Sequence, residues 1–200
     1  MQITYHTDGA EYIEINDLYS QDELNSIMLE LHFLNVSGVF VDPDKSGSAQ
    51  DKKGKNLKRN KAVHLDAVYA KKDTSMVLRA NRKLFSLNYD YSKLSSVFRA
   101  IKNSTQDFTM LSYYENADFY KKHFDYSMLT ALTYFHYQPK KFTGGELVLT
   151  EYGVELEPKH NTTYIFCSME DHEVKPVVMQ KEDCGKGFGR YCMTQFMSME

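Results

Sequence analysis

Short runs of strand-forming residues fill the second half of this 200-residue chain, and they constrain its fold more than any other feature. From about residue 105 onward, segments rich in Thr, Tyr, Phe, Val and Leu alternate with Gly, Pro, Asp and Asn. Six or more such strands in sequence predict a β-sandwich or β-barrel. The predicted strands are FTMLSYY, MLTALTYFHY, GELVLT, TTYIFCS, EVKPVVM and RYCMTQFM.

The first half of the chain predicts helices that support this core. A capping box at Ser20 precedes apolar residues at helical spacing. Further helices are expected over residues 74–85 and 91–102, and a strand over residues 62–70. Residues 42–61 are polar and rich in turn formers, which predicts a long surface loop or a mobile flap.

Composition excludes several classes of protein. The 24 Lys and Arg residues nearly balance the 27 Asp and Glu residues, which argues against an electrostatic nucleic-acid binder. No apolar run approaches the roughly 18 residues of a membrane-spanning helix. The N-terminal sequence lacks the pattern of a signal peptide, and three cysteines without framework spacing fit a reducing compartment. We therefore expect a cytoplasmic protein with no membrane partner.

Three His-x-Asp triplets stand out, beginning at His6, His64 and His123. On a strand, such a triplet places an imidazole and a carboxylate on the same face. The triplet alone decides nothing, because it occurs three times. His6 is interpreted as part of a surface strand, and His64 as part of a strand beside an active-site mouth.

Only the third triplet has the context of a metal site. His123 and Asp125 are followed, within strand-like sequence, by His172 and then by Arg190 on a late strand. Two imidazoles and one carboxylate on one face leave open coordination positions, as in non-haem Fe(II) oxygenases. The planar fork of Arg190 would suit the far carboxylate of a 2-oxo acid better than a lysine would.

In these motifs the chain resembles the prolyl 4-hydroxylase branch of the Fe(II)/2-oxoglutarate-dependent oxygenases. The resemblance lies in the order and spacing of motifs and covers residues 109–197. The matching segments are Tyr113 and Tyr120 ahead of His123, the strand Thr130–Tyr134, the turn Gly144–Leu147, the segment His172–Val177, and the strand Arg190–Thr194.

This resemblance implies a mostly β protein with N-terminal helices and a double-stranded β-helix (jelly roll) core. Residues 1–200 would form a single domain, with helical support and the flap in residues 1–105 and the core in residues 106–200. Fe(II), 2-oxoglutarate and O2 would be required, with ascorbate keeping the iron reduced, and a prolyl residue of a protein or peptide would be the substrate. The implied metal ligands are His123, Asp125 and His172, and the implied co-substrate ligands are Arg190, Tyr134, Thr194 and Tyr113.

The sequence departs from the family pattern in ways that leave alternatives open. The interval from His172 to Arg190 is longer than usual, and Lys181 stands at the usual interval. We favour Arg190, because RYCMT reproduces the family strand whereas residues 180–189 are typical of a Gly-rich loop. Phe196 replaces a common Trp and His136 a common Asn, so the substrate stays open. The alternatives are the same chemistry on a free amino acid or alkylated nucleic acid, and a non-enzymatic jelly-roll binding module.

Overall fold

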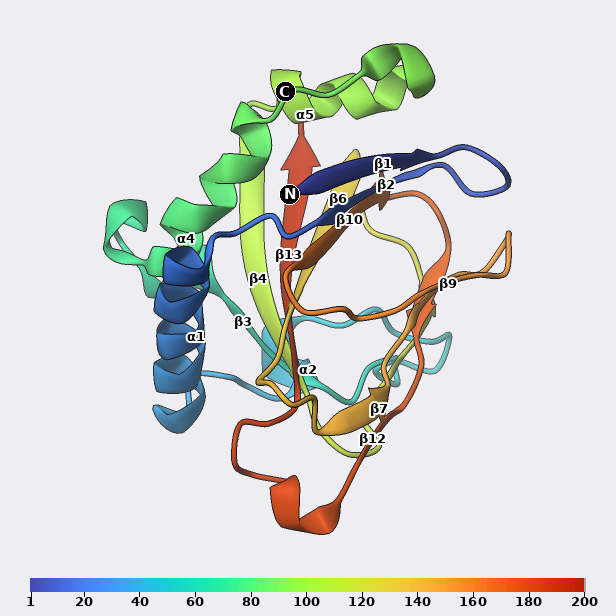
Figure 1. Cartoon of the computed structure of the whole chain (residues 1–200). Helices are drawn as coiled ribbons and strands as arrows, with labels where there is room; N and C mark the ends of the chain where they lie inside the picture. Colours follow the sequence, from blue (N-terminus) through green and yellow to red (C-terminus); the bar gives the residue numbers. More distant parts are fainter. Residues whose placement is uncertain (200) are drawn as a thin grey trace.

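A seven-stranded antiparallel sheet forms the middle layer of the molecule in the computed structural model, which describes residues 1–199 (Figure 1). Its strand order is β1-β2-β10-β6-β13-β4-β3. The bounds of these strands are β1 Gln2–His6, β2 Tyr12–Asn16, β3 Lys61–His64, β4 Gln106–Tyr114, β6 Leu129–Phe135, β10 Thr162–Cys167 and β13 Arg190–Ser198. The chain is mostly β, as predicted.

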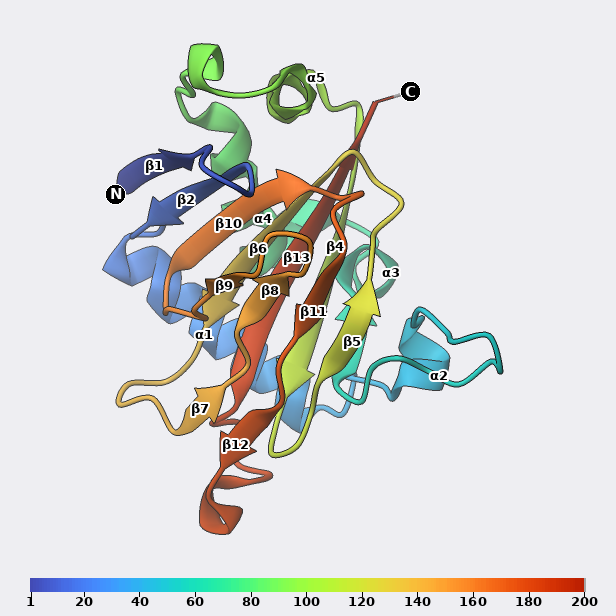
Figure 2. The ribbon, with the colours of Figure 1, turned by 90° about the vertical axis from the view of Figure 1, so that its right-hand side faces the viewer.

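A smaller antiparallel sheet lies against one face of the large sheet (Figure 2). Its strand order is β5-β11-β8-β9. The bounds are β5 Tyr120–His123, β8 Leu147–Leu149, β9 Val154–Leu156 and β11 His172–Val174, and a separate pair is formed by β7 Phe142–Gly144 and β12 Val177–Met179. Apolar side chains such as Leu147 and Phe166 fill the space between the two sheets.

Helices cover the opposite face of the large sheet (Figure 1). The longest is α1 (Gln21–Val36), and its predicted capping box is present: the Ser20 hydroxyl accepts from the Glu23 backbone N–H, and the Glu23 carboxylate accepts from the Ser20 backbone N–H. The other helices are α2 Pro43–Ser46, α3 Leu65–Val68, α4 Met76–Ala80 and α5 Ala100–Asn103, with 3-10 helices at Lys72–Thr74, Asn81–Ser86, Tyr91–Lys93, Ser96–Arg99 and Lys181–Asp183. No helix within residues 1–199 is both long enough and apolar enough to span a bilayer.

Alternation along the central strands separates two cores. On β13, Tyr191 and Met193 pack toward the helices, whereas Arg190 and Cys192 face the smaller sheet. Successive side chains of a strand point to opposite faces, so a shift of one residue exchanges the two environments. This periodicity decides which residues of the large sheet reach the functional site.

Each of the six predicted strand runs contains a strand, and one of them is split. The run EVKPVVM forms both β11 and β12, because Pro176 lacks the backbone N–H that a ladder needs. The helix expected over residues 91–102 is wrong as a continuous element. There the chain forms two 3-10 turns and α5, and the Asp90 carboxylate accepts hydrogen bonds from both the backbone N–H and the hydroxyl of Ser92, which favours a local turn over a continuous helix. The strand expected over residues 62–70 ends at His64.

Candidate metal and co-substrate site

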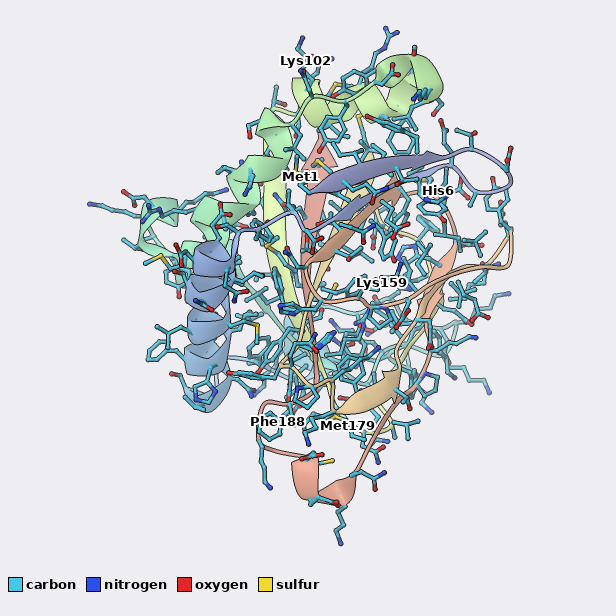
Figure 3. All side chains as sticks on the ribbon, in the orientation of Figure 1. Met1, His6, Lys102, Lys159, Met179 and Phe188 are labelled. Atoms are coloured by element: carbon cyan, nitrogen blue, oxygen red, sulfur yellow. The ribbon has the colours of Figure 1, made fainter. Side chains whose placement is uncertain are left out.

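The third His-x-Asp triplet and the distal histidine come together at one end of the smaller sheet. His172 on β11 lies directly opposite His123 on β5, and Asp125 follows β5 by two residues. One donor atom from each of these three side chains lies within 4.8 Å of the other two. In residues 1–199, no other group of His, Cys, Asp and Glu side chains meets this criterion. Figure 3 shows His6 on β1, which is the edge strand of the large sheet.

Both imidazoles are oriented by backbone carbonyls. Nδ1 of His123 lies 2.8 Å from the carbonyl oxygen of Lys121, and Nδ1 of His172 lies 2.8 Å from that of Glu170. A carbonyl oxygen only accepts, so each Nδ1 carries a proton, and Nε2 is the ring nitrogen left to bind a metal. Burial also lowers the pKa of His123 to about 3. That ring is therefore neutral near neutral pH, which is its metal-binding form.

Asp125 completes the set as a largely enclosed carboxylate. Its Oδ2 atom accepts a hydrogen bond from the Thr130 hydroxyl at 2.7 Å and lies 3.6 Å from His172 Nε2. Burial raises the pKa of Asp125, while His172 and the Thr130 hydroxyl act in the opposite direction. Two imidazoles and one carboxylate suit Fe(II) with positions open for further ligands.

A buried cation lies behind the three side chains. Arg190 is 1% exposed, and none of its three guanidinium nitrogens has a hydrogen-bond partner within residues 1–199. The hydroxyl of Tyr134 is also buried without a partner there. Arg190 and Thr194 line the same narrow cavity as His123, Asp125 and His172. An unpaired buried charge costs several kcal/mol, so this cavity is suited to an anion such as a carboxylate.

Comparisons with known proteins agree with this geometry. The sequence model of the 2OG-Fe(II) oxygenase superfamily matches residues 109–198. These residues belong to that superfamily. The match covers the same part of the chain as the motif resemblance and confirms it. No protein of curated function matches the sequence.

Three of the solved structures similar to this chain are prolyl hydroxylases. A Pseudomonas putida prolyl-4-hydroxylase shares 18% identity with a TM-score of 0.57, covering 94% of this chain and 92% of that chain. A Trichoplax adhaerens prolyl hydroxylase, solved with a hypoxia inducible factor peptide fragment, shares 18% identity with a TM-score of 0.58, covering 94% and 83%. A viral collagen prolyl hydroxylase from Paramecium Bursaria Chlorella virus-1, in a 2OG complex, shares 12% identity with a TM-score of 0.55, covering 94% and 96%. At these identities the likeness concerns the fold.

One residue expected to line the co-substrate pocket, Tyr113, does not line this cavity. Tyr113 lies on the helix-facing side of β4, where its ring centre is 4.5 Å from that of Tyr191 and its hydroxyl donates to Glu115 at 2.7 Å. Tyr114 lines the cavity instead. The expectation counted residues along the chain to His123, whereas strand alternation and the pairing of β4 with β13 determine the face.

The two candidate anchors occupy different environments. Lys181 is exposed at the start of a 3-10 helix and does not line the cavity, whereas Arg190 does. The Gly144-Gly145 turn packs directly on Arg190. Gly145 has a φ of +75°, and a Cβ atom there would lie 2.9 Å from Arg190 Cδ. Glycine is therefore required at this position by both the backbone conformation and the close approach.

A groove of about 1100 Å³ opens in front of the metal-binding set. Residues 42–61, called the flap below, form one wall through Ala49 and Leu57. The flap therefore lies beside the site. It is not a bare loop, since it contains α2 and its backbone bonds to the segment around β5, for example from Lys121 N–H to Leu57 O at 2.9 Å. Exposed aromatic rings line the groove as well: Phe108, Phe124 and Tyr126.

Proposed function

We propose that this oxygenase uses Fe(II), 2-oxoglutarate and O2 to hydroxylate a prolyl residue in a protein or peptide. One observation supports it above all others: the unpaired guanidinium of Arg190 shares a cavity with His123, Asp125 and His172. A metal site alone does not need a buried cation nearby. A metal site that also binds a dicarboxylic acid does.

The chain's own residues hold and orient the reactants. His123, Asp125 and His172 would hold Fe(II), which together with 2-oxoglutarate and O2 supplies the oxidising power to attack an unactivated C–H bond. The fork of Arg190 would bind the far carboxylate of 2-oxoglutarate. The Tyr134 hydroxyl would donate to the same carboxylate, with Thr194 beside it. Enclosure between the two sheets keeps water from competing for these bonds.

We propose that the two facing sheets form the double-stranded β-helix of this superfamily and that residues 1–200 act as a single domain. Residues 106–200 provide every proposed metal and co-substrate ligand. The helices of residues 1–105 pack on the back of the large sheet and support the strand register on which the site depends. Ascorbate is proposed as the reductant that keeps the iron in its Fe(II) state.

The groove supports a polypeptide substrate over a free amino acid. Its size exceeds what one amino acid fills, and pockets for single small ligands are typically at the lower end of about 300–1,000 Å³. Its rings, above all the 94% exposed Tyr126, offer apolar contact to an extended chain. The similar Trichoplax adhaerens structure was solved with a peptide fragment, which supports the same class of substrate.

The test is turnover by purified protein with Fe(II), 2-oxoglutarate and ascorbate. We expect succinate formation that is accelerated by a proline-containing peptide, with one added oxygen atom found on the proline by mass spectrometry. His172→Ala should abolish both signals, whereas His6→Ala, at a remote His-x-Asp triplet, should retain them. Modification of free proline or of alkylated nucleic acid in place of the peptide would reassign the substrate. Binding of the peptide without any succinate formation would favour a non-enzymatic binding module.

A further inference from the structure

A chain of hydroxyl groups leads to the carboxylate of Asp125. The Ser127 and Ser168 hydroxyl oxygens are 2.7 Å apart, the Ser168 and Thr130 oxygens are 2.8 Å apart, and Thr130 Oγ1 lies 2.7 Å from Asp125 Oδ2. Thr130 is the second residue of β6, and Ser168 directly follows β10, the strand that pairs with β6 (Figure 2). Thr130 and Ser168 are fully buried.

Counting protons gives these hydrogen bonds a direction. A carboxylate only accepts, so Thr130 must donate its single proton to Asp125. The contact between Thr130 and Ser168 then needs the proton of Ser168, and the contact between Ser168 and Ser127 needs that of Ser127. Ser127 could instead donate to the Leu129 carbonyl oxygen at 3.2 Å. In that case only the Ser168 proton would be left for the two contacts that Ser168 makes, with Thr130 and with Ser127. One of these short oxygen–oxygen contacts would then have no hydrogen between its atoms.

Backbone bonds fix the same group of residues. The Asp125 N–H donates to the Ser168 carbonyl at 2.9 Å, and the Ser168 N–H donates to the Met128 carbonyl at 3.1 Å. Ser168 is therefore held to the Asp125 segment by its main chain as well as by its side chain. The Thr130 hydroxyl has one direction in which to donate, and Asp125 lies there.

We propose that Thr130 is a positioning residue for the metal-binding carboxylate and that Ser168 and Ser127 orient its hydroxyl. The directed chain Ser127 to Ser168 to Thr130 ends on one carboxylate oxygen. It limits rotation of the Asp125 side chain and so fixes the direction in which the carboxylate faces the metal site. Partners of this kind typically contribute about tenfold to a hundredfold to metal affinity. The inference rests on the proposed metal site.

The experiment measures Mn(II) affinity by calorimetric titration, without any turnover. Thr130→Val removes the hydroxyl while keeping a branched side chain of similar shape, and it should weaken Mn(II) binding about tenfold. Thr130→Ser restores the hydroxyl and should bind within about twofold of the unmodified protein. The matched control is Thr133→Val. Its hydroxyl also makes a buried 2.7 Å contact, with Thr163, but on the helix-facing side of β6, so Mn(II) affinity should not change.

Ser168→Ala provides an independent arm if Thr130→Val does not fold. It leaves the Thr130 hydroxyl free to rotate and should weaken Mn(II) binding by a smaller factor, about threefold. Combined with Thr130→Ser, it should weaken Mn(II) binding by the same factor and no more. Unchanged Mn(II) affinity in Thr130→Val or in Ser168→Ala overturns the proposal. If the unmodified protein binds no Mn(II), or if His172→Ala binds it equally well, the proposed metal site itself is wrong.

Discussion

Tyr114 and Arg190 lie directly opposite each other on β4 and β13, with the guanidinium carbon 4.5 Å from the centre of the phenol ring. The ring of Tyr134 lies at 4.6 Å from the same carbon. Two aromatic rings thus hold the cation while its nitrogens stay unbonded. Contacts of this type orient a guanidinium without consuming its hydrogen-bond donors.

Tyr114 should therefore matter to co-substrate binding, and Tyr113 should not. Removal of one cation–π partner costs about 0.5–2 kcal/mol, so Tyr114→Leu should weaken 2-oxoglutarate binding by about two- to thirtyfold. Tyr113→Leu alters the helix-facing core and should lower the melting temperature while affinity stays within about twofold. Equilibrium titration of the two variants with 2-oxoglutarate checks this. Equal losses of affinity would show that strand alternation does not separate the two roles.

Arg190→Met should separate stability from function. A charge-assisted bond contributes about 1.5–3 kcal/mol, so 2-oxoglutarate affinity should fall at least tenfold while Mn(II) binding is retained. The free energy of unfolding without ligands should rise, because replacing a buried unpaired charge with an apolar side chain often stabilises by about 1–4 kcal/mol. Denaturant titration measures this rise. Lys181→Ala should change neither quantity, and the reverse pattern would move the anchor to Lys181.

Gly145→Ala should damage the anchor through contact rather than through strain alone. Its new methyl group would lie 2.9 Å from both Arg190 Cδ and Val177 Cγ2. Gly153→Ala is the control, since Gly153 has a similar φ of +64° and nothing within 4 Å of the added Cβ. Each substitution should cost about 1–2 kcal/mol from the backbone. Only Gly145→Ala should also weaken 2-oxoglutarate binding, and equal affinity of both variants would refute the packing argument.

Lys58 should make stability rise with pH above neutrality. It is 4% exposed, no ion pair with it is found within residues 1–199, and burial lowers its pKa to about 8. Between pH 8 and the ordinary pKa near 10.5, the unfolded chain holds more protons on Lys58 than the folded protein does, so the free energy of unfolding rises with pH there. Below pH 8 the full penalty is present.

Lys58→Met removes this penalty. At pH 7 the variant should be more stable by about 1–3 kcal/mol, and its advantage should shrink as pH approaches 10.5. Denaturant unfolding at pH 7 and pH 10 measures the difference, with exposed Lys53→Met as the control that should show no such trend. A pH-independent gain would mean that packing, not charge, explains the effect.

The flap should select the substrate and leave co-substrate chemistry unaffected. Gln50 and Asn56 face each other across an antiparallel β-bridge, and the side-chain NH2 group of Gln50 donates to the Asn56 side-chain oxygen at 3.4 Å. Residues 51–55 can therefore be deleted with little displacement of their flanks. The deletion should spare 2-oxoglutarate turnover without substrate and weaken hydroxylation of a peptide, measured as succinate released with and without peptide. Loss of turnover in both conditions would make the flap part of the scaffold.

The order of the motifs predicted the metal-binding and co-substrate residues better than hydrophobic periodicity predicted the helices and strands. His123, Asp125, His172 and Arg190 meet in one cavity, as the spacing of the motifs indicated. Period-2 alternation could not distinguish Tyr113 from Tyr114, because β4 is buried on both faces at its end and carries aromatic residues on each. Thr130 gave no signal either, since a threonine in a strand is ordinary and its role depends on Ser168, 38 residues away.

Elements in the first half were harder to predict for a different reason. The helix beginning after Ser20 has both a cap and a continuous apolar stripe, and it forms as expected. Residues 91–102 have the apolar spacing, but Asp90 caps only a single 3-10 turn, and the second 3-10 turn and α5 begin without a side-chain cap. Tertiary packing against the large sheet, not helix propensity, then determines each short piece.

His123 lies on the four-residue edge strand β5 of the smaller sheet, and His172 lies opposite it on the three-residue strand β11. So few ladder bonds hold these strands that a slip of one residue would turn one imidazole away from the other. A cation bound by both imidazole rings would link the two strands, and its binding would oppose their local separation by mass action. Loss of such a cation would then expose this part of the protein to proteolysis.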